Sequence, residues 1–166
     1  MNKVIVIGSP GAGKSTFSRR LRDKTGLPLF YLDRIWHLAD RTTISREEFD
    51  ARLGEILRQE RWIIDGNYSR TMEVRLAACD TVFCLDYPVE VCLAGARERV
   101  GQVREEMPWV EETLDEEFRQ FIVDFPITKR PQMLRLIEEK GHNKEIHIFR
   151  SREEAEQYLS FGFRKG

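Results

Sequence analysis

The stretch that most constrains the fold lies near the start of the chain, at residues 4–16. It begins with the β-branched run Val4-Ile5-Val6-Ile7, which is typical of a strand buried on both faces of a parallel sheet. A glycine-rich segment follows and fits the pattern G-x-x-x-x-G-K-[ST] without departure. A turn that fits by chance is the alternative, but the buried strand before it and the amphipathic helix pattern after it argue against chance.

The chemistry of phosphate binding explains this spacing. Glycines let the backbone curl with its N–H groups pointing inward, which makes a concave anion-binding nest. The Lys14 ammonium would reach the β- and γ-phosphates of ATP, the Ser15 hydroxyl would ligate Mg²⁺, and the positive end of a helix dipole would lie behind the phosphates. We therefore predict an ATP and Mg²⁺ site whose nucleotide-binding residues are Gly8, Ser9, Pro10, Gly11, Ala12, Gly13, Lys14, Ser15 and Thr16.

Length and composition indicate a single domain over residues 1–166, because 166 residues with 41% hydrophobic content suffice for one full core. The formal net charge of −1 gives no general attraction to nucleic acid or to an anionic membrane. The local basic cluster of Arg19, Arg20 and Arg22 is typical of a solvated helix face. With no signal peptide, no long apolar run and three cysteines without a C-x-x-C pair, we expect a cytoplasmic protein without nucleic-acid, membrane or zinc partners.

Apolar runs alternate with amphipathic helix patterns along the chain. The predicted strands are residues 4–7, 29–32, 61–64, 81–85 and 145–149. This alternation predicts an α/β fold with a parallel sheet and right-handed crossovers. The acid-rich residues 101–118, with Pro108-Trp109, interrupt it, and apolar positions over 118–125 indicate a helix. We predict that residues 101–125 are an inserted lid.

Asp33 directly follows the second predicted strand. Ligands of open α/β sheets bind outside the carboxyl ends of the strands, so Asp33 is a candidate functional residue, beside Arg34 and Trp36. A turn or helix-capping aspartate is the alternative.

The chain contains, in this order, the segments GSPGAGKST, YLDRIW, WIIDGNYSR and FCLDYP, followed by an arginine-bearing helix and the predicted lid. The set resembles the small P-loop kinases of the adenylate and shikimate kinase type, and more closely the DNA topology modulation (FlaR-related) proteins. The resemblance covers nearly the whole chain. It implies a three-layer P-loop NTPase fold with a five-stranded parallel sheet in the order 2-3-1-4-5 and a helical lid insert.

The resemblance also implies a phosphotransferase that moves the γ-phosphoryl group of ATP to a small acceptor. Adenylate kinases carry D-G-[FY]-P-R after the corresponding strand, where the aspartate acts on Mg²⁺ through water and the arginine grips the acceptor. Here the segment DGNYSR at residues 65–70 matches the start, lacks the proline and has its arginine one residue later. Gly66, Asn67 and Arg70 are the candidate acceptor ligands from this segment.

Asp33 stands where shikimate kinase-like enzymes place an aspartate that hydrogen-bonds an acceptor hydroxyl. The resemblance therefore implies a hydroxyl-bearing acceptor, a catalytic role for Asp33, and neighbouring acceptor contacts from Arg34 and Trp36.

Two aspartates compete for the Mg²⁺-associated role. Asp86 ends the more apolar strand and better matches a hydrophobic run closed by an aspartate. Asp65 follows the predicted strand at residues 61–64. In the strand order that the resemblance implies, this strand lies directly beside the strand at residues 4–7 that leads into the glycine-rich loop. We favour Asp65, because closeness to the metal matters more than the pattern.

Arginines flank the predicted lid. Arg97, Arg99 and Arg104 precede the acid-rich stretch and Arg130 follows it. Helical spacing puts Arg97 and Arg99 on different faces, so we favour Arg99 as a catalytic residue, with Arg104 on the nucleotide and Arg130 completing catalysis when the lid closes. The alternative is that these arginines pair with Glu105, Glu106 and their neighbours on a solvated surface, where ion pairs are weak.

Two other functions stay open at this point. One is an adenylate kinase-like enzyme that phosphorylates a nucleoside monophosphate. The other is a nucleotide-operated regulatory ATPase that binds DNA or protein, which the near-neutral charge disfavours.

Overall fold

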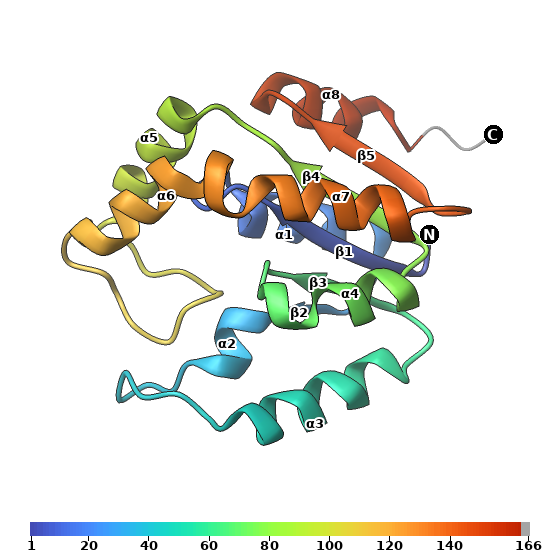
Figure 1. The fold of residues 1–166 in the computed structure, drawn as a ribbon, viewed down its shortest axis with the longest axis horizontal. Coiled ribbons are helices and arrows are strands. Elements are labelled where there is room, and N and C mark those ends of the chain that lie inside the picture. Colours follow the sequence, from blue (N-terminus) through green and yellow to red (C-terminus); the bar gives the residue numbers. More distant parts are fainter. Residues whose placement is uncertain (164–166) are drawn as a thin grey trace.

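Five strands form one parallel sheet in the order β2-β3-β1-β4-β5 (Figure 1). The computed structural model describes residues 1–163. Its strands are β1 (Lys3–Gly8), β2 (Leu29–Tyr31), β3 (Trp62–Asp65), β4 (Thr81–Leu85) and β5 (Glu145–Phe149). The expected order and direction of the strands are confirmed. Since β1 lies between β3 and β4, the phosphate-loop strand occupies the centre of the sheet.

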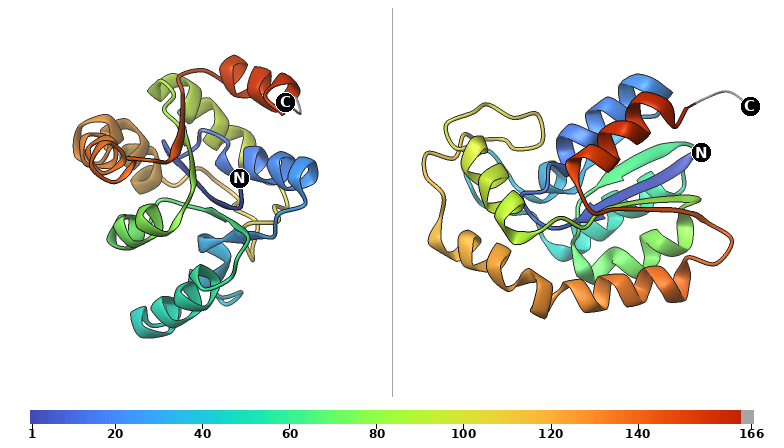
Figure 2. Two further views of the ribbon diagram at one scale, coloured as in Figure 1. Left: turned by 90° about the vertical axis from the view of Figure 1, so that its right-hand side faces the viewer. Right: turned by 90° about the horizontal axis from the view of Figure 1, so that it is seen from above.

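Helices cover both faces of this sheet and complete three layers (Figure 2). They are α1 (Lys14–Thr25), α2 (Leu32–Trp36), α3 (Arg46–Leu57), α4 (Ser69–Ala78), α5 (Val89–Arg99), α6 (Glu116–Thr128), α7 (Arg130–Lys140) and α8 (Arg152–Phe161). Helices α3, α4 and α7 pack on one face, and α1, α5 and α8 pack on the other.

Alternate residues of β1 enter the two cores, as a strand buried on both faces requires. Ile5 and Ile7 pack with side chains such as Leu76 of α4. Val4 and Val6 pack with the opposite helices. The carboxyl end of β1 is thereby held rigidly where the phosphate loop begins.

The second strand is shorter than expected. It ends at Tyr31, and Leu32 begins the short helix α2, so Asp33 lies in the first turn of a helix and not at the end of a strand. Helix α3 begins with a capping contact, since the Ser45 hydroxyl accepts a hydrogen bond from the Glu48 N–H at 3.1 Å.

The lid region also differs from the expectation of a helical insert. Residues 101–115 form no helix or strand, and α6 begins only at Glu116. This helix continues through Pro126 to Thr128, past the expected end at 125. The buried side chains of Ile122 and Phe125 hold its inner face, which outweighs the backbone hydrogen bond lost at the proline.

Within residues 1–163, no helix combines the length and the apolar character needed to cross a membrane.

Candidate active site

The phosphate loop joins β1 to α1. Gly13 at the start of α1 has φ of 96°, a left-handed conformation that glycine adopts without steric cost. The Lys14 ammonium folds back over the loop and donates to the carbonyl oxygens of Ser9 at 3.0 Å and Gly8 at 3.3 Å. Burial lowers the pKa of Lys14, while nearby Asp65 opposes that shift. The loop thus carries a partly desolvated cation at its mouth.

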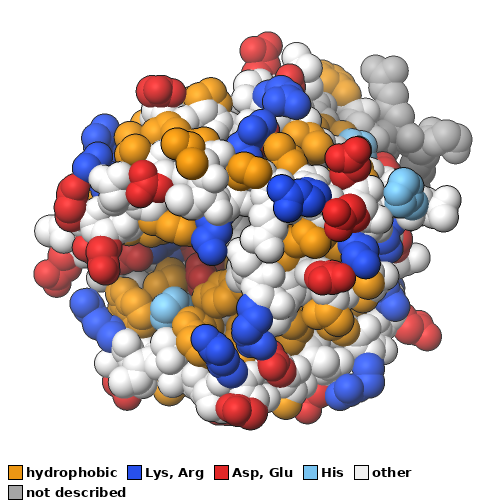
Figure 3. Space-filling model, viewed as in Figure 1, with side chains coloured by type: hydrophobic (Ala, Val, Ile, Leu, Met, Phe, Trp, Pro, Cys, Tyr) orange, Lys and Arg blue, Asp and Glu red, His pale blue; other side chains and the backbone are white. Residues whose placement is uncertain are grey.

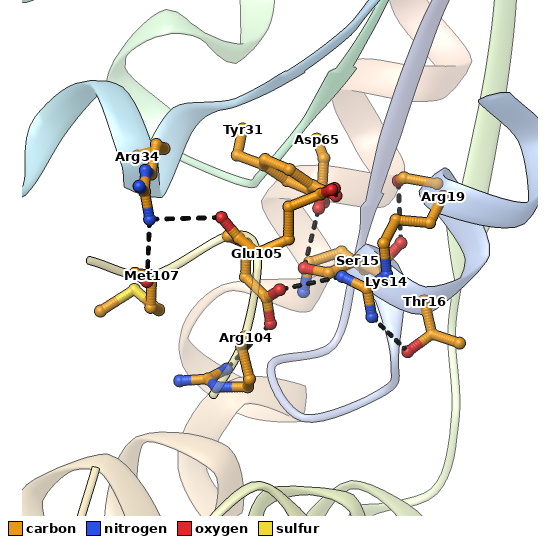
Figure 4. A network of polar contacts seen from close by, with 12 residues as sticks. Lys14, Ser15, Thr16, Arg19, Tyr31, Arg34, Asp65, Arg104, Glu105 and Met107 are labelled. Atoms are coloured by element: carbon orange, nitrogen blue, oxygen red, sulfur yellow. Dashed lines mark hydrogen bonds and ion pairs between the residues drawn. The ribbon is translucent and has the colours of Figure 1, made fainter. Parts of the chain in front are cut away.

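Ser15 and Asp65 meet beside this loop (Figure 4). The Ser15 hydroxyl donates to Oδ2 of Asp65 at 2.9 Å. Asp65 ends β3, which pairs with β1, and its side chain is buried. Burial raises the pKa of Asp65 to about 7, against the opposing effects of Lys14 and Ser15.

A hydroxyl and a carboxylate are oxygen ligands of the type that Mg²⁺ takes, so Ser15 and Asp65 fit that ion. No group of three or more His, Cys, Asp or Glu side chains suited to a metal gathers in residues 1–163. Phosphate oxygens and water would therefore have to supply the other ligands, as is usual for Mg²⁺.

Asp86, the competitor of Asp65, is committed to another partner. Its two carboxylate oxygens accept from Nε and Nη2 of Arg130, both at 2.8 Å. Arg150 adds a longer ion pair at 3.7 Å. This bidentate pairing joins the end of β4 to the start of α7.

A cleft of about 1000 Å³ opens in front of the phosphate loop. Figure 3 shows a hollow on this face with hydrophobic side chains inside it. Its lining includes twelve of the residues singled out from the sequence, namely Pro10, Gly11, Gly13, Lys14, Ser15, Thr16, Asp33, Asp65, Gly66, Asn67, Arg99 and Arg104. The lining does not include Gly8, Ser9, Ala12, Arg34, Trp36, Arg70 or Arg130.

Three of the expected acceptor contacts point elsewhere. Both Nη atoms of Arg70 donate to Asp50, at 3.1 and 2.7 Å. The Trp36 ring packs edge-on against Phe49, with 5.7 Å between ring centroids. Arg34 donates to backbone carbonyls of the lid (Figure 4). These side chains stabilise the walls around the cleft and do not line it.

Residues 104–107 of the lid are anchored to α1 and β2. The Glu106 carboxylate is buried and accepts from Arg19 at 2.9 Å and from Arg104 at 3.1 Å. The Glu105 carboxylate accepts from Arg22 at 3.0 Å and from the Tyr31 hydroxyl. Arg104 therefore pairs with acidic neighbours, but in a buried position and not on a solvated surface.

Arg99 and Arg104 both present unused donors inside the molecule. Their Nε atoms are buried and have no hydrogen-bond partner among residues 1–163, whereas Arg97 is exposed. The Arg99 guanidinium lies 5.6 Å from the centre of the Phe118 ring. Burial lowers the pKa of Arg99, and the positive charge of Arg104 lowers it further. Two neighbouring cations with free donors form an arrangement that an anion would stabilise.

The segment after β3 links Gly8, at the end of β1, to Asp33 of α2. Asn67 holds Gly8 from both sides, because its Oδ1 accepts from the Gly8 N–H at 3.0 Å and its Nδ2 donates to the Gly8 carbonyl at 2.6 Å. The Tyr68 hydroxyl donates to Oδ1 of Asp33 at 2.7 Å. Tyr68 itself has φ of 37°, which is strained for a bulky residue.

Arg75 holds residues 66–68 in place, and the sequence analysis did not single it out. Its side chain is fully buried in α4 and donates to the carbonyls of Gly66 at 2.8 Å, Tyr68 at 3.1 Å and Asn67. Burial lowers its pKa to about 10. The available signal was a charged residue inside the buried stripe that contains Met72 and Leu76.

A second hollow of about 330 Å³ lies on the other side of the phosphate loop. Its walls come from the phosphate loop, α1, α5 and α8 and from Gln102 after α5, and include Thr16, Arg20 and Arg152. The phosphate loop therefore lies between two spaces, a large cleft and a smaller hollow.

The parallel sheet in the order β2-β3-β1-β4-β5, with its central strand leading into a glycine-rich loop, defines a P-loop NTPase fold of the kinase-like type. No protein-family model matches the chain. Over 97 residues it is 30% identical to an adenylate kinase of Thermotoga neapolitana, a match over 57% of this chain and 43% of that protein. The match thus spans less than half the length of this curated relative.

Two solved shikimate kinases share the fold. The enzyme from Bacteroides thetaiotaomicron has a TM-score of 0.57 at 19% identity, with 95% of this chain and 93% of that chain covered. The enzyme from Acinetobacter baumannii, solved in complex with shikimate, has a TM-score of 0.58 at 20% identity, with 99% and 97% covered. Likenesses at this identity establish the fold.

Proposed function

We propose that this protein transfers the γ-phosphoryl group of ATP to a hydroxyl group of a small acceptor. The observation that carries the proposal is the phosphate loop, with Lys14 over it and the Ser15–Asp65 pair beside it, facing a cleft that also holds Asp33. The likeness to adenylate and shikimate kinases supports the same class of reaction.

In this proposal the nucleotide lies across the phosphate loop. Its nucleoside end occupies the smaller hollow beside Gln102 and Arg152, and its phosphates lie under Lys14. In this scheme the guanidinium groups of Arg99 and Arg104, which line the cleft and have unused Nε donors, would turn toward the γ-phosphate. Fixed positive charge at this place stabilises the transferring group more than the ground state, which is the main contribution a protein makes to phosphoryl transfer.

Transfer forms a bond between the acceptor oxygen and the γ-phosphorus and breaks the bond from that phosphorus to the β–γ bridging oxygen. ADP leaves with the bridging oxygen, and the hydroxyl proton passes to Asp33, which the Tyr68 hydroxyl orients. Mg²⁺ held by Ser15 and Asp65 would neutralise phosphate charge. These residues position the reactants and balance charge, and none forms a covalent intermediate.

Residues 101–125 act as the lid in this scheme. The segment 104–107 already crosses toward α1 through Glu105 and Glu106. A lid that tightens over both substrates would exclude water and so favour transfer over hydrolysis of ATP.

The second candidate is a nucleoside monophosphate kinase, favoured by the 97-residue match to adenylate kinase. The finer resemblance to DNA topology modulation proteins would instead imply a regulatory ATPase. Release of ADP that depends on a small acceptor would distinguish both kinases from a regulatory ATPase.

The test compares Lys14→Ala with Lys24→Ala, which removes an exposed ammonium from the same helix. We expect Lys14→Ala to keep the wild-type fold by circular dichroism and to lose at least about 100-fold in acceptor-dependent ADP release, because a charge aimed at the transition state is gone. Lys24→Ala should be active. Equal turnover by the wild type and Lys14→Ala would overturn the proposal.

A further inference from the structure

Aromatic rings and carboxylates line the part of the cleft around Asp33, where the acceptor of the proposed reaction would bind. We call it the acceptor pocket and define it by Asp33, His37, Tyr68, Trp109 and Phe125, all of which line the cleft. A hydroxyl acceptor that reaches Asp33 must lie against these side chains. Their chemistry therefore selects the acceptor.

The walls of the acceptor pocket are fixed in place. The Tyr68 ring stacks on Phe49 with 5.4 Å between centroids, and its hydroxyl is held by Asp33. The Trp109 ring meets His37 edge-on at 5.2 Å, and the Arg41 guanidinium lies 5.6 Å from its centre. Aromatic walls held in this way favour a ligand with a flat or apolar face.

Three arginines around the pocket are already engaged within the protein. Arg34 donates to the carbonyl oxygens of Met107 at 3.0 Å and Glu105 at 3.4 Å. Arg70 makes its two hydrogen bonds to Asp50, and Arg130 makes two to Asp86. None of these three guanidinium groups lines the cleft, so none offers a fork for a carboxylate or phosphate on the acceptor.

The remaining charges on this side do not form an anion site. Arg41 and Lys129 line the cleft from exposed positions, as do the carboxylates of Glu112 and Asp115, while Asp33 is half-buried. Lys14, Arg99 and Arg104 also line the cleft, and the proposed function assigns these three cations to the phosphates of ATP. An acceptor with its own negative charge would then meet the half-buried carboxylate of Asp33 and two exposed carboxylates, and the exposed cations Arg41 and Lys129 would offset them only weakly. Repulsion and desolvation would then oppose its binding.

We propose that the acceptor is an uncharged hydroxyl compound with a flat ring, and that the pocket disfavours acceptors carrying a carboxylate or a phosphate. The inference rests on the proposed function, because it describes the acceptor of that reaction. It implies that the acceptor is neither shikimate, which carries a carboxylate, nor adenylate, which carries a phosphate.

The test uses pairs of compounds that differ only in the anionic group. One pair is adenosine and adenosine 5′-monophosphate, and the other is methyl shikimate and shikimate. Acceptor-dependent ADP release is measured with saturating MgATP. In the pair that is turned over, we expect kcat/KM for the uncharged member to exceed that of the anion by at least about tenfold, or about 1.4 kcal/mol. An anion used as well as its uncharged partner, or better, would overturn the inference.

Calorimetric titration of the same four compounds into the full-length protein, without nucleotide, keeps the test independent of turnover. If MgATP neither binds nor is used, the proposed function fails and there is no acceptor, whereas tighter binding of the uncharged members would still assign the pocket to an uncharged ligand. If MgATP binds and no uncharged member is bound or used, the acceptor inference fails and the ATP site stands.

A matched pair of lid variants tests the aromatic wall. Trp109→Ala should raise KM for the uncharged acceptor at least about tenfold while KM for MgATP stays within twofold, because the lost ring area is on the acceptor side. Val103→Ala is the control, since Val103 is 89% exposed in the same segment. An unchanged acceptor KM in Trp109→Ala would contradict the assigned wall.

Discussion

Arg75 is a positioning residue whose three carbonyl partners all belong to the segment that holds Gly8 and Asp33. Arg75→Met keeps the volume of the side chain but leaves these carbonyls without a buried donor. We expect a loss of about 2–4 kcal/mol in the free energy of unfolding, measured by urea denaturation.

Arg119→Met is the control for Arg75, since among residues 1–163 the Arg119 side chain pairs only with exposed Glu116 on the surface of α6. It should leave the denaturation midpoint near that of the wild type, because exposed ion pairs contribute little. Arg75→Lys should recover part of the loss, because one ammonium reaches fewer carbonyls than a guanidinium does. A wild-type denaturation midpoint for Arg75→Met would refute the positioning role.

The raised pKa of the buried Asp65 carboxyl should make the stability of the protein depend on pH. Its pKa is about 7 in the folded protein against an ordinary value of 3.8, so between these values the folded state binds more protons than the unfolded state. The free energy of unfolding should therefore fall through this group as the pH rises from about 4 to about 7.

Asp65→Asn should remove this contribution. Between pH 5 and pH 8 the wild type should lose at least about 1.4 kcal/mol relative to the variant, the equivalent of one unit of pKa. Glu60→Gln, at an exposed position, should keep the wild-type slope. Parallel curves for the wild type and Asp65→Asn would show that the buried carboxyl does not titrate in this range.

At the scale of elements, the close approach of α5 to the phosphate loop depends on glycine. A Cβ added at Gly95 would overlap the carbonyl oxygen of Gly11, and one at Gly11 would overlap that of Cys92. We expect Gly95→Ala to cost about 1–3 kcal/mol of stability through overpacking and to weaken MgATP binding, measured by calorimetry.

Gly54→Ala is the matched control in a helix. A Cβ there meets only the Arg58 guanidinium, at 3.5 Å, so the gain in helix propensity should stabilise the protein by about 0.5–1 kcal/mol. The two substitutions should thus change stability in opposite directions. Stabilisation by both would mean that α5 and the loop have room to separate.

At the scale of the whole molecule, the lid connects α5 to α6 and also contacts α1 and β2 through Glu105 and Glu106. Hydrogen exchange across residues 101–125 should slow when an ATP analogue and an acceptor bind together, because the closed segment then gains contacts from both substrates. Mass spectrometry of peptides from this region measures the change.

Glu106→Gln weakens the anchor to Arg19 and Arg104 and should speed exchange in the free protein. Glu112→Gln, an exposed change in the same segment, should leave it near the wild-type rate. Identical exchange in the free and doubly bound protein would remove the case for a lid.

Much of the framework is determined by patterns that are local in the sequence. The apolar run at residues 4–7 and the glycine-rich loop after it are continuous in the chain, and their spacing alone predicts which backbone groups and side chains would contact a phosphate. The strand order followed from a resemblance carried by several such segments, and it is confirmed.

The partners of the charged side chains were decided only by the tertiary structure. Arg70 meets Asp50, Arg130 meets Asp86, and Arg75 meets the backbone of residues 66–68. An arginine can reach any carboxylate or carbonyl that the fold brings near, and helix packing across the sheet chooses among them. The sequence by itself therefore determined the phosphate loop, while long-range packing decided which cations were left for the substrates.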